Sequence, residues 1–195
     1  MIRFLSLAII AVVISGAVNA QHMNIGIKAG LNLYNIKNSN DVKYDLKPGF
    51  NAGVFSHIHL SKQFAFQPEI VFSGQGAKYT TGGVDTKINL NYINVPLILQ
   101  YMFDNGFRLQ AGPQFGFLIG ANAVTNDVKT DIKDNLKPLD IAIGVGLGYI
   151  HVPSGFGLNA RYNHGLTNIN ENSSSSKSFN RGFQLGVFYQ FQHKD

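Results

Sequence analysis

The sequence predicts an all-β fold, an eight-stranded antiparallel up-and-down transmembrane β-barrel, and three observations support it. Apolar residues alternate with small or polar residues along most of the chain, a period of two that is typical of half-buried strands. Short and long connections between the alternating segments follow one another in turn. Charged residues make up only 14% of the chain, against roughly 25% in soluble domains.

The alternating segments are longer than ordinary strands. Most cover about 10–15 residues, whereas a strand usually has about 5–6, and no segment keeps a helical period. A transmembrane strand needs about ten alternating residues, so these segments are long enough to cross a membrane. In the fourth segment the phase changes at Tyr92 and Ile93, which predicts a β-bulge. The predicted strands cover residues 24–34, 49–60, 64–76, 88–103, 107–121, 138–151, 156–166 and 181–192.

The connections predict where the two ends of the barrel lie. Tight turns are expected around 61–63, 104–106 and 153–155, and Asn105-Gly106 is a strong hairpin signal. Because short and long connections alternate, every long one falls at the same end, and both termini fall at the other. Outer-membrane barrels have this layout, with short periplasmic turns and longer external loops. The long connections are expected at 35–48, 77–87, 122–137 and 167–180.

Composition decides which face of the strands points outward. A soluble, lipocalin-like barrel is the competing fold, and there the apolar face would line the interior. Its outer surface would then consist of residues such as Gly30, Asn51 and Gln110, with five charged residues in all eight strands. A soluble surface carries roughly 25–35% charged residues. We therefore expect the apolar face to contact lipid and the polar face to line the lumen.

Three glycines share the inward face of one strand, "LDIAIGVGLGYIHV" (139–152). Gly144, Gly146 and Gly148 would each weaken an ordinary strand, because glycine has no side chain to pack. The lumen of an eight-stranded barrel is just wide enough for side chains to fill it. The glycines are therefore predicted to leave room for long polar side chains. A nucleotide-binding glycine loop would have to open a helix, whereas here the alternation continues.

The few charges within the strands all fall in the inward phase. At about 3.3 Å per residue, Lys28, Glu69 and Arg161 lie at the same depth, and the third and seventh strands face each other across the ring. We expect Glu69 to bridge the lumen to Arg161 or Lys28. An ionic core that fills the lumen is one interpretation, and a plug or gate for a narrow pore is the other. Arg108, nearer the short turns, completes the predicted cluster, whereas Asp140 lies too far away.

The N-terminus and the overall composition narrow the location and the partners. Arg3, an apolar run and the small residues up to Ala20 predict a signal peptide over 1–20, cleaved after Ala20, which leaves a barrel domain over 21–195. The chain has no cysteine, which excludes disulfides and thiolate metal sites. Its net charge of +5 is spread along the chain, so a nucleic-acid partner is not expected.

No catalytic, cofactor-binding or metal-binding residues are predicted. His57, His59, His151 and His164 belong to no catalytic motif, although His57 and His59 point the same way and would need a third ligand to hold a metal. The stretches "NDVKYDLK", "VDTKINL" and "NDVKTDIK" predict strands that continue above the membrane, with Asp–Lys pairs between neighbours. A calcium site is the alternative, but the spacing fits no EF-hand. Its ligands would be Asp41, Asp45, Asp127, Asp131 and Asp134.

Several stretches taken together resemble one family of proteins. They are "IGIKAGLNL", "FQPEIVFSGQGAK", "YINVPLILQY", "LQAGPQFGFLIGA" and "ARYNHGLTNI". In this order and spacing the chain resembles the PorT-like outer-membrane β-barrel proteins of Bacteroidota, which carry the porin-family label. The resemblance implies an eight-stranded barrel in the outer membrane. It also suggests envelope or type IX secretion partners, because the namesake is tied to that apparatus. No catalytic residues carry over.

The expected function is that of a small integral outer-membrane barrel with a structural or binding role through its extracellular loops. Its expected partners are outer-membrane lipid, the barrel-assembly machinery that inserts it, and an envelope or secretion complex. We expect a monomer without a cofactor, and not an enzyme. A narrow porin-like channel for small solutes is one alternative, and an outer-membrane lipid-modifying hydrolase is another.

Overall fold

The structure is a computed structural model that describes residues 23–39, 44–172 and 177–191. The expected signal peptide, its cleavage after Ala20, and Asp41 lie outside these residues. Within the described ranges no helix is long and apolar enough to cross a membrane. The described elements are β1 (Met23–Asn38), β2 (Asp45–His59), β3 (Phe64–Thr81), β4 (Val84–Met102), β5 (Phe107–Thr125), β6 (Val128–Asp131), the 3-10 helix η2 (Lys133–Asn135), β7 (Leu139–His151), β8 (Phe156–Gly165) and β9 (Ser178–Gln190).

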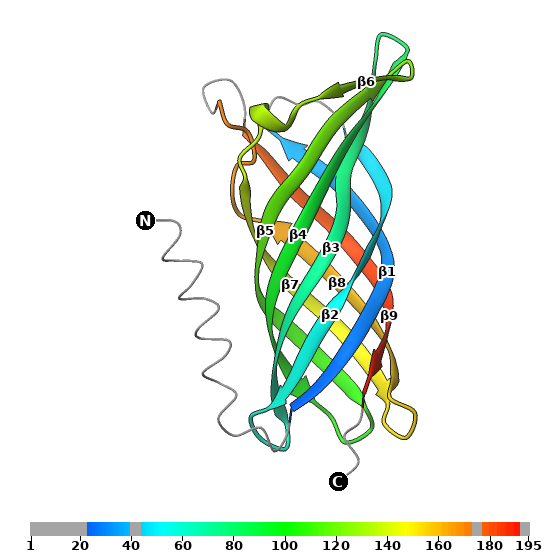
Figure 1. The fold of residues 1–195 in the computed structure, drawn as a ribbon, viewed down its shortest axis with the longest axis vertical. Helices are drawn as coiled ribbons and strands as arrows, with labels where there is room; N and C mark the ends of the chain where they lie inside the picture. The colour runs from blue at the N-terminus through cyan, green and yellow to red at the C-terminus, as the bar shows by residue number, and fades with distance from the viewer. Residues whose placement is uncertain (1–22, 40–43, 173–176, 192–195) are drawn as a thin grey trace.

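Eight of the nine described strands close into a ring, as Figure 1 shows. The strand order is β4-β3-β2-β1-β9-β8-β7-β5, and the pairing of β4 with β5 completes the circle. All these pairs are antiparallel. The predicted eight-stranded up-and-down barrel is confirmed. The short strand β6 lies within the stretch 126–133 that was predicted to continue a strand above the membrane, and it pairs only with the end of β5.

Burial alternates along most of each strand of the ring, with the apolar face outward. On β1, Leu31 is 67% exposed whereas its neighbour Asn32 is 0% exposed, and on β4 Leu99 is 48% exposed beside a fully buried Gln100. A water-soluble fold hides such leucines, whereas a transmembrane barrel presents them to lipid. The predicted orientation is therefore confirmed, and the polar residues form the lining of the lumen.

Three short turns lie at one end of the barrel, at the bottom of Figure 1. We call this the turn end. Gly106 and Gly155 adopt positive φ angles of 90° and 74°, which a residue with a side chain rarely adopts. In the third turn, which joins β2 to β3, the Ser61 hydroxyl oxygen accepts a hydrogen bond from the Phe64 amide at 3.1 Å. These are the tight connections that the sequence predicts.

At the opposite end, which we call the arm end, much of what was expected as loop is paired strand. The predicted loop 77–87 is wrong: β3 and β4 stay paired up to a two-residue turn of Gly82 and Gly83, both with positive φ. Asn126 and Asp127 form a similar turn between β5 and β6, so 122–137 is also partly strand. Both turns fit the twist of the strands they join, which lets the hairpins extend beyond the ring.

The charged residues of these extensions pair less simply than predicted. Asp45 lies opposite Lys78 in the strand register, as the Asp–Lys alternation suggests, but Lys78 also lies opposite Lys87. Neither of the two ion pairs between described residues belongs to the extensions. The strands do continue above the ring, so that part of the prediction is confirmed, whereas a ladder of Asp–Lys salt bridges is absent from the described part of the chain.

The bulge predicted at Tyr92 and Ile93 exists, but the extra residue is on the neighbouring strand. Asn91 pairs with Gly120 and Tyr92 pairs with Leu118, which leaves Ile119 of β5 without a partner in the register. On β4 the inward phase is unbroken, with Leu90 and Tyr92 both buried. The phase seemed to change in the sequence because the interior at this level is apolar rather than polar.

The interior therefore has three levels. An apolar cluster fills the arm end and contains Ile36, Ala77, Leu90, Tyr92, Leu118, Ala121 and Ile169. A smaller cluster of Phe55, Ile150 and Phe188 lies nearer the turn end. Most of the buried polar and charged side chains come between and beside these clusters. This polar layer is the place where chemistry or transport through the barrel would have to occur.

Candidate functional site: the barrel lumen

The glycines of β7 make room for the side chains of the two flanking strands. A Cβ atom added at Gly144 would lie 2.9 Å from Asn163 Oδ1 and 3.2 Å from Arg161 Cδ, both on β8. One added at Gly148 would lie 2.9 Å from Gln110 Nε2 on β5. Real Cβ atoms essentially never come as close as 2.9 Å to another heavy atom, and a contact of 3.2 Å requires the neighbour to shift. The space predicted beside these glycines is thus occupied by long polar side chains.

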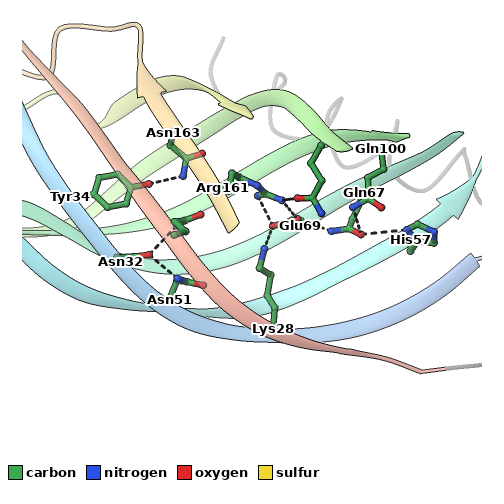
Figure 2. A network of polar contacts seen from close by, with 12 residues as sticks. Lys28, Asn32, Tyr34, Asn51, His57, Gln67, Glu69, Gln100, Arg161 and Asn163 are labelled. Carbon is green, nitrogen blue, oxygen red and sulfur yellow. Dashed lines mark hydrogen bonds and ion pairs between the residues drawn. The ribbon is translucent and has the colours of Figure 1, made fainter. Parts of the chain in front are cut away.

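The centre of the lumen holds a carboxylate between two cations (Figure 2). Glu69 Oε2 lies 2.9 Å from Lys28 Nζ, and Glu69 Oε1 lies 2.8 Å from Arg161 Nη2. Arg161 Nη1 also donates to Glu69 Oε2 at 3.1 Å, so the arginine contact is bidentate. Strands β3 and β8 stand four places apart in the ring of eight, and the pair therefore spans the barrel. The structure brings together Lys28, Glu69 and Arg161, which we call the lumen triad.

Amide side chains complete the hydrogen bonding of the triad. Gln67 Nε2 donates to Glu69 Oε1 at 2.9 Å, and Arg161 Nη2 donates to Gln110 Oε1 at 3.0 Å. A buried ion pair is tolerated only when its geometry is good and the remaining polar atoms are hydrogen-bonded. The glutamate meets this condition, because each of its two oxygens accepts more than one bond.

Arg108 stands outside the triad although the predicted cluster included it. Its guanidinium lies 3.4 Å from Gln100 Oε1 and 3.5 Å from Gln190 Oε1, and no carboxylate of the described chain pairs with it. It connects to Glu69 only through amides, because Gln100 Nε2 donates to Gln67 Oε1 at 2.9 Å. The residue sits near the turn end, where the sequence places it.

A second polar layer lies toward the arm end and is built from amides. The Asn32 side chain is 0% exposed; its Oδ1 accepts from Asn51 at 2.7 Å and from Gln184 at 3.2 Å. Beyond it, Asn163 Nδ2 donates to the Tyr34 hydroxyl oxygen at 2.9 Å. Asp140 belongs to neither group, since its carboxylate accepts from Thr167 at 2.8 Å and from Asn180 at 3.0 Å. These layers tie strands on several sides of the ring to one another.

The sequence analysis named the charged residues of the lumen and missed these amides. Gln67, Gln100 and Gln110 occupy the inward phase of β3, β4 and β5 and are each buried. Their phase was visible in the sequence, but an uncharged side chain gives no hint of which partner it selects. The partner of each amide is decided by its depth in the lumen, and this depth depends on the register of the strands.

Little free space remains around the triad. A cavity of about 10 Å³ is bordered by Lys28, Arg161, Asn159 and the rings of Phe55 and Phe188. That volume suits about one water molecule. Arg161 Nε and Asn159 Oδ1 are buried without a hydrogen-bond partner among the described protein atoms, so both are available to such a water. Side chains fill the lumen beside the triad.

The arm end of the lumen is covered by two connecting segments, 132–138 and 166–171, which we call the lid. Lys137 N donates to Ile169 O at 2.8 Å, and Glu171 N donates to Asn135 O at 3.0 Å. Ile169 is 1% exposed and packs into the apolar cluster below. The two segments therefore bond to each other and are anchored to the barrel by the buried side chain of Ile169.

The histidines considered as catalytic or metal-binding residues do not form one cluster. His57 and His59 contact each other, with ring centroids 4.7 Å apart, and His57 Nδ1 is 3.4 Å from Gln67 Oε1. His151 Nδ1 lies 2.9 Å from Ser154 Oγ, a contact that the sequence analysis did not foresee, but the serine also accepts from the Phe156 amide and so belongs to the turn. No group of three or more His, Asp or Glu residues in the described chain could hold a metal.

Comparison with known proteins places the chain in a family. The family model described as "Outer membrane protein beta-barrel domain" matches residues 19–171, most of the chain. The protein belongs to this family. It is therefore an outer-membrane barrel, and in such barrels the short turns are periplasmic and the longer connections external. The turn end of this outer-membrane barrel accordingly faces the periplasm, and its arm end and lid face outward.

Solved structures share the fold of this outer-membrane barrel at low sequence identity. The attachment invasion locus protein Ail of Yersinia pestis is 16% identical, with 88% of this chain and 100% of that chain covered and a TM-score of 0.53. Neisserial surface protein A is 14% identical, with 86% and 97% covered and a TM-score of 0.56. Ail in complex with the heparin analogue sucrose octasulfate gives a TM-score of 0.52 at 16% identity, with 88% and 100% covered. No curated protein matches the chain.

Proposed function

We propose that this protein is a closed outer-membrane anchor that presents its external hairpins and lid to a binding partner. The filled lumen carries the proposal: the cavity beside the triad holds about 10 Å³, and the two lid segments bond to each other through Lys137 and Ile169, with Ile169 buried in the apolar cluster. A solute would have to displace a bidentate ion pair and a packed apolar cluster. With the lumen closed, the external surface is left as the working part.

The external surface is suited to binding because it is rigid and has a recess. The β3–β4 and β5–β6 hairpins continue the sheet beyond the ring with paired strands up to their turns. A recess of about 370 Å³ lies between the lid and β5 and is lined by both apolar and charged residues: Leu118, Leu136, Pro138, Lys133, Asp134 and Glu171. Paired strands and a bonded lid lose little conformational entropy on binding, which favours affinity.

The kind of partner is inferred from the resemblance of the sequence to a known family, because the lumen gives no information about it. The PorT-like resemblance favours a component of an envelope or type IX secretion complex in Bacteroidota. Ail, which shares the fold, is named as an attachment protein, and this supports a binding role for the external face of a small barrel. We therefore propose a structural or binding role for a monomeric barrel. The barrel-assembly machinery would be its partner during insertion.

A narrow channel is the second candidate, and the polar lining of the lumen favours it. Conductance separates the two functions. The full-length protein, purified from outer membranes and shown to be folded by its faster migration on unboiled gels, would be placed in planar bilayers beside a known porin as a positive control. We expect no discrete current steps. Steps of reproducible size, absent from an equally prepared empty bilayer, would contradict the closed anchor and support the channel.

A further inference from the structure

Three adjacent strands carry a row with basic residues directly above an apolar row on the outer surface. On β1, β9 and β8, the outward residues Leu33, Phe183 and Tyr162 stand side by side in the register. Leu33 and Phe183 are 40% and 55% exposed, as residues that contact lipid are. The next outward row, two residues along each strand toward the external end, contains Asn35, Arg181 and His164. Two residues farther up β1 is Lys37, which stands opposite the outward residue Phe179 of β9.

Arg181 is held in place by a neighbour on this row. Its Nε donates to Asn35 Oδ1 at 3.1 Å, which fixes one edge of the guanidinium and leaves the two terminal nitrogens as donors. His164 stands directly across from Arg181, and its Nδ1 is 3.3 Å from the Tyr162 hydroxyl. Lys37 is diagonal to Arg181 at the next position on the same face, close enough for long side chains to converge.

The cationic charge of this cluster lacks compensation from its own strands. The described strands β1, β8 and β9 contain no aspartate or glutamate. Both ion pairs found between described residues lie in the lumen, on the other face of the wall. Arg181 and Lys37 are diagonal neighbours of like charge on this face, so their repulsion is not offset by an acidic residue of these strands. An anion from outside the described chain would relieve this cost.

The position of the cluster identifies the source of that anion. A step of two residues is about 6.6 Å along the strand, and a tilt of about 40° converts this to about 5 Å of height above the row of Leu33 and Phe183. Lipid phosphates lie immediately outside the hydrocarbon region, and an outward aromatic residue such as Phe179, beside Lys37, is typical of this interfacial level. A soluble anion gains no contact with the apolar row below, whereas a lipid whose acyl chains pack on Leu33 and Phe183 places its phosphate beside Arg181.

We propose that Arg181, Lys37 and His164 form a binding site for the phosphate of an outer-leaflet lipid, of the class of phosphorylated lipid A. Arg181 supplies a planar fork that matches a phosphate, and Lys37 adds a point charge. His164 contributes a ring N–H, and the row of Leu33, Phe183 and Tyr162 supports the acyl chains below. This site does not depend on whether the lumen is closed. Lipid binding tests it, whereas conductance tests the closed lumen.

The test compares lipids and single-charge variants by native mass spectrometry. Full-length protein in neutral detergent would be titrated with bis-phosphorylated lipid A and with the same lipid after phosphatase treatment. We expect Arg181→Gln and Lys37→Gln each to weaken binding of the phosphorylated lipid about fivefold, since one basic residue near an anionic surface contributes about 1 kcal/mol. Lys62→Gln removes one charge in the β2–β3 turn at the periplasmic end and is expected to change nothing.

Folding of each variant is checked by heat-dependent migration on gels, and Lys37 is the safer variant because no hydrogen bond of its side chain to a described residue is found. Equal affinity of the wild type for both lipids would overturn the proposal. So would a loss in Lys62→Gln as large as in Arg181→Gln, which would mean nonspecific charge. Complete displacement of the lipid by millimolar inorganic phosphate would also overturn it, because the site would then take a small anion rather than a lipid headgroup.

Discussion

Arg161 on β8 reaches across the barrel to Glu69 on β3, with Nη2 2.8 Å from Oε1. The two residues are 92 positions apart in the sequence and on opposite walls of the ring. Both are 2% exposed, so their charges interact with little screening by water. This contact, together with Lys28, links three strands through the interior and makes the lumen a structural core.

Removal of the carboxylate should be costly. In Glu69→Ala, Lys28 and Arg161 remain buried without their anion, and breaking a buried pair in this way costs about 3–5 kcal/mol. We expect the free energy of unfolding to fall by this amount in urea titrations of the protein in lipid vesicles. Glu171→Ala in the exposed part of the lid is the matched control and should change the free energy by less than about 0.5 kcal/mol. A Glu69→Ala midpoint equal to that of the wild type would mean that the triad contributes no stability.

Simultaneous replacement of all three charges should cost less than removal of one. Lys28→Met, Glu69→Leu and Arg161→Met together leave no unpaired ion, and apolar replacements of buried ion pairs are often neutral or stabilising. We expect the triple variant to unfold at a higher urea concentration than Glu69→Ala and to migrate as a folded barrel on unboiled gels. If the triple variant is the less stable of the two, the charges are required for more than mutual neutralisation.

The glycines of β7 should tolerate no added methyl group. A Cβ atom at Gly146 would lie 3.1 Å from Arg161 Cα and closer still to the Ala160 carbonyl oxygen, and backbone atoms cannot easily move away. Overpacking of this kind costs about 1–3 kcal/mol. Gly146→Ala should therefore lower the urea midpoint. Gly120→Ala is the control, because the nearest atom to its Cβ would be Asn91 Nδ2 at 3.9 Å. Equal midpoints for the two variants would refute the packing explanation.

The sequence was sufficient to predict most of the ring, because lipid imposes a period of two that persists through each strand. The inward phase of Lys28, Glu69 and Arg161 follows from that period, and their shared depth follows from counting along the strands. The extra residue Ile119 could not be located in this way, because a bulge on β5 leaves the alternation on β4 intact. The ascending part of the β3–β4 hairpin, 77–81, was missed for a different reason, since polar residues above the membrane resemble a loop, whereas its descending part was predicted as a strand from 84.

The position of Arg108 and the lid also lay beyond sequence reasoning. Arg108 shares the inward phase, but its partners are amides of β4 and β9 that only the closed ring brings near. Ile169 is a single apolar residue in a polar, low-complexity stretch, and nothing in its neighbours indicates that it is buried. Contacts between connections are set by the three-dimensional closure of the barrel rather than by local pattern.

The lid should open locally when its buried anchor is shortened. Ile169 is 1% exposed in the apolar cluster, and truncation of such a side chain to alanine costs about 2–5 kcal/mol at a site that cannot relax. The lid is bonded mainly to itself and the rim, so this loss should appear as local opening rather than unfolding of the ring. In Ile169→Ala we expect the amides of Lys137 and Glu171 to exchange hydrogen about tenfold faster or more, because 1.4 kcal/mol corresponds to a factor of ten. Strand amides of β7 and β8 should exchange as in the wild type.

Leu166→Ala, at a residue that is 56% exposed, is the control and should leave the lid amides unchanged. Uniform acceleration over the whole barrel would show that lid and ring unfold together, and no acceleration at all would show that Ile169 does not hold the lid closed.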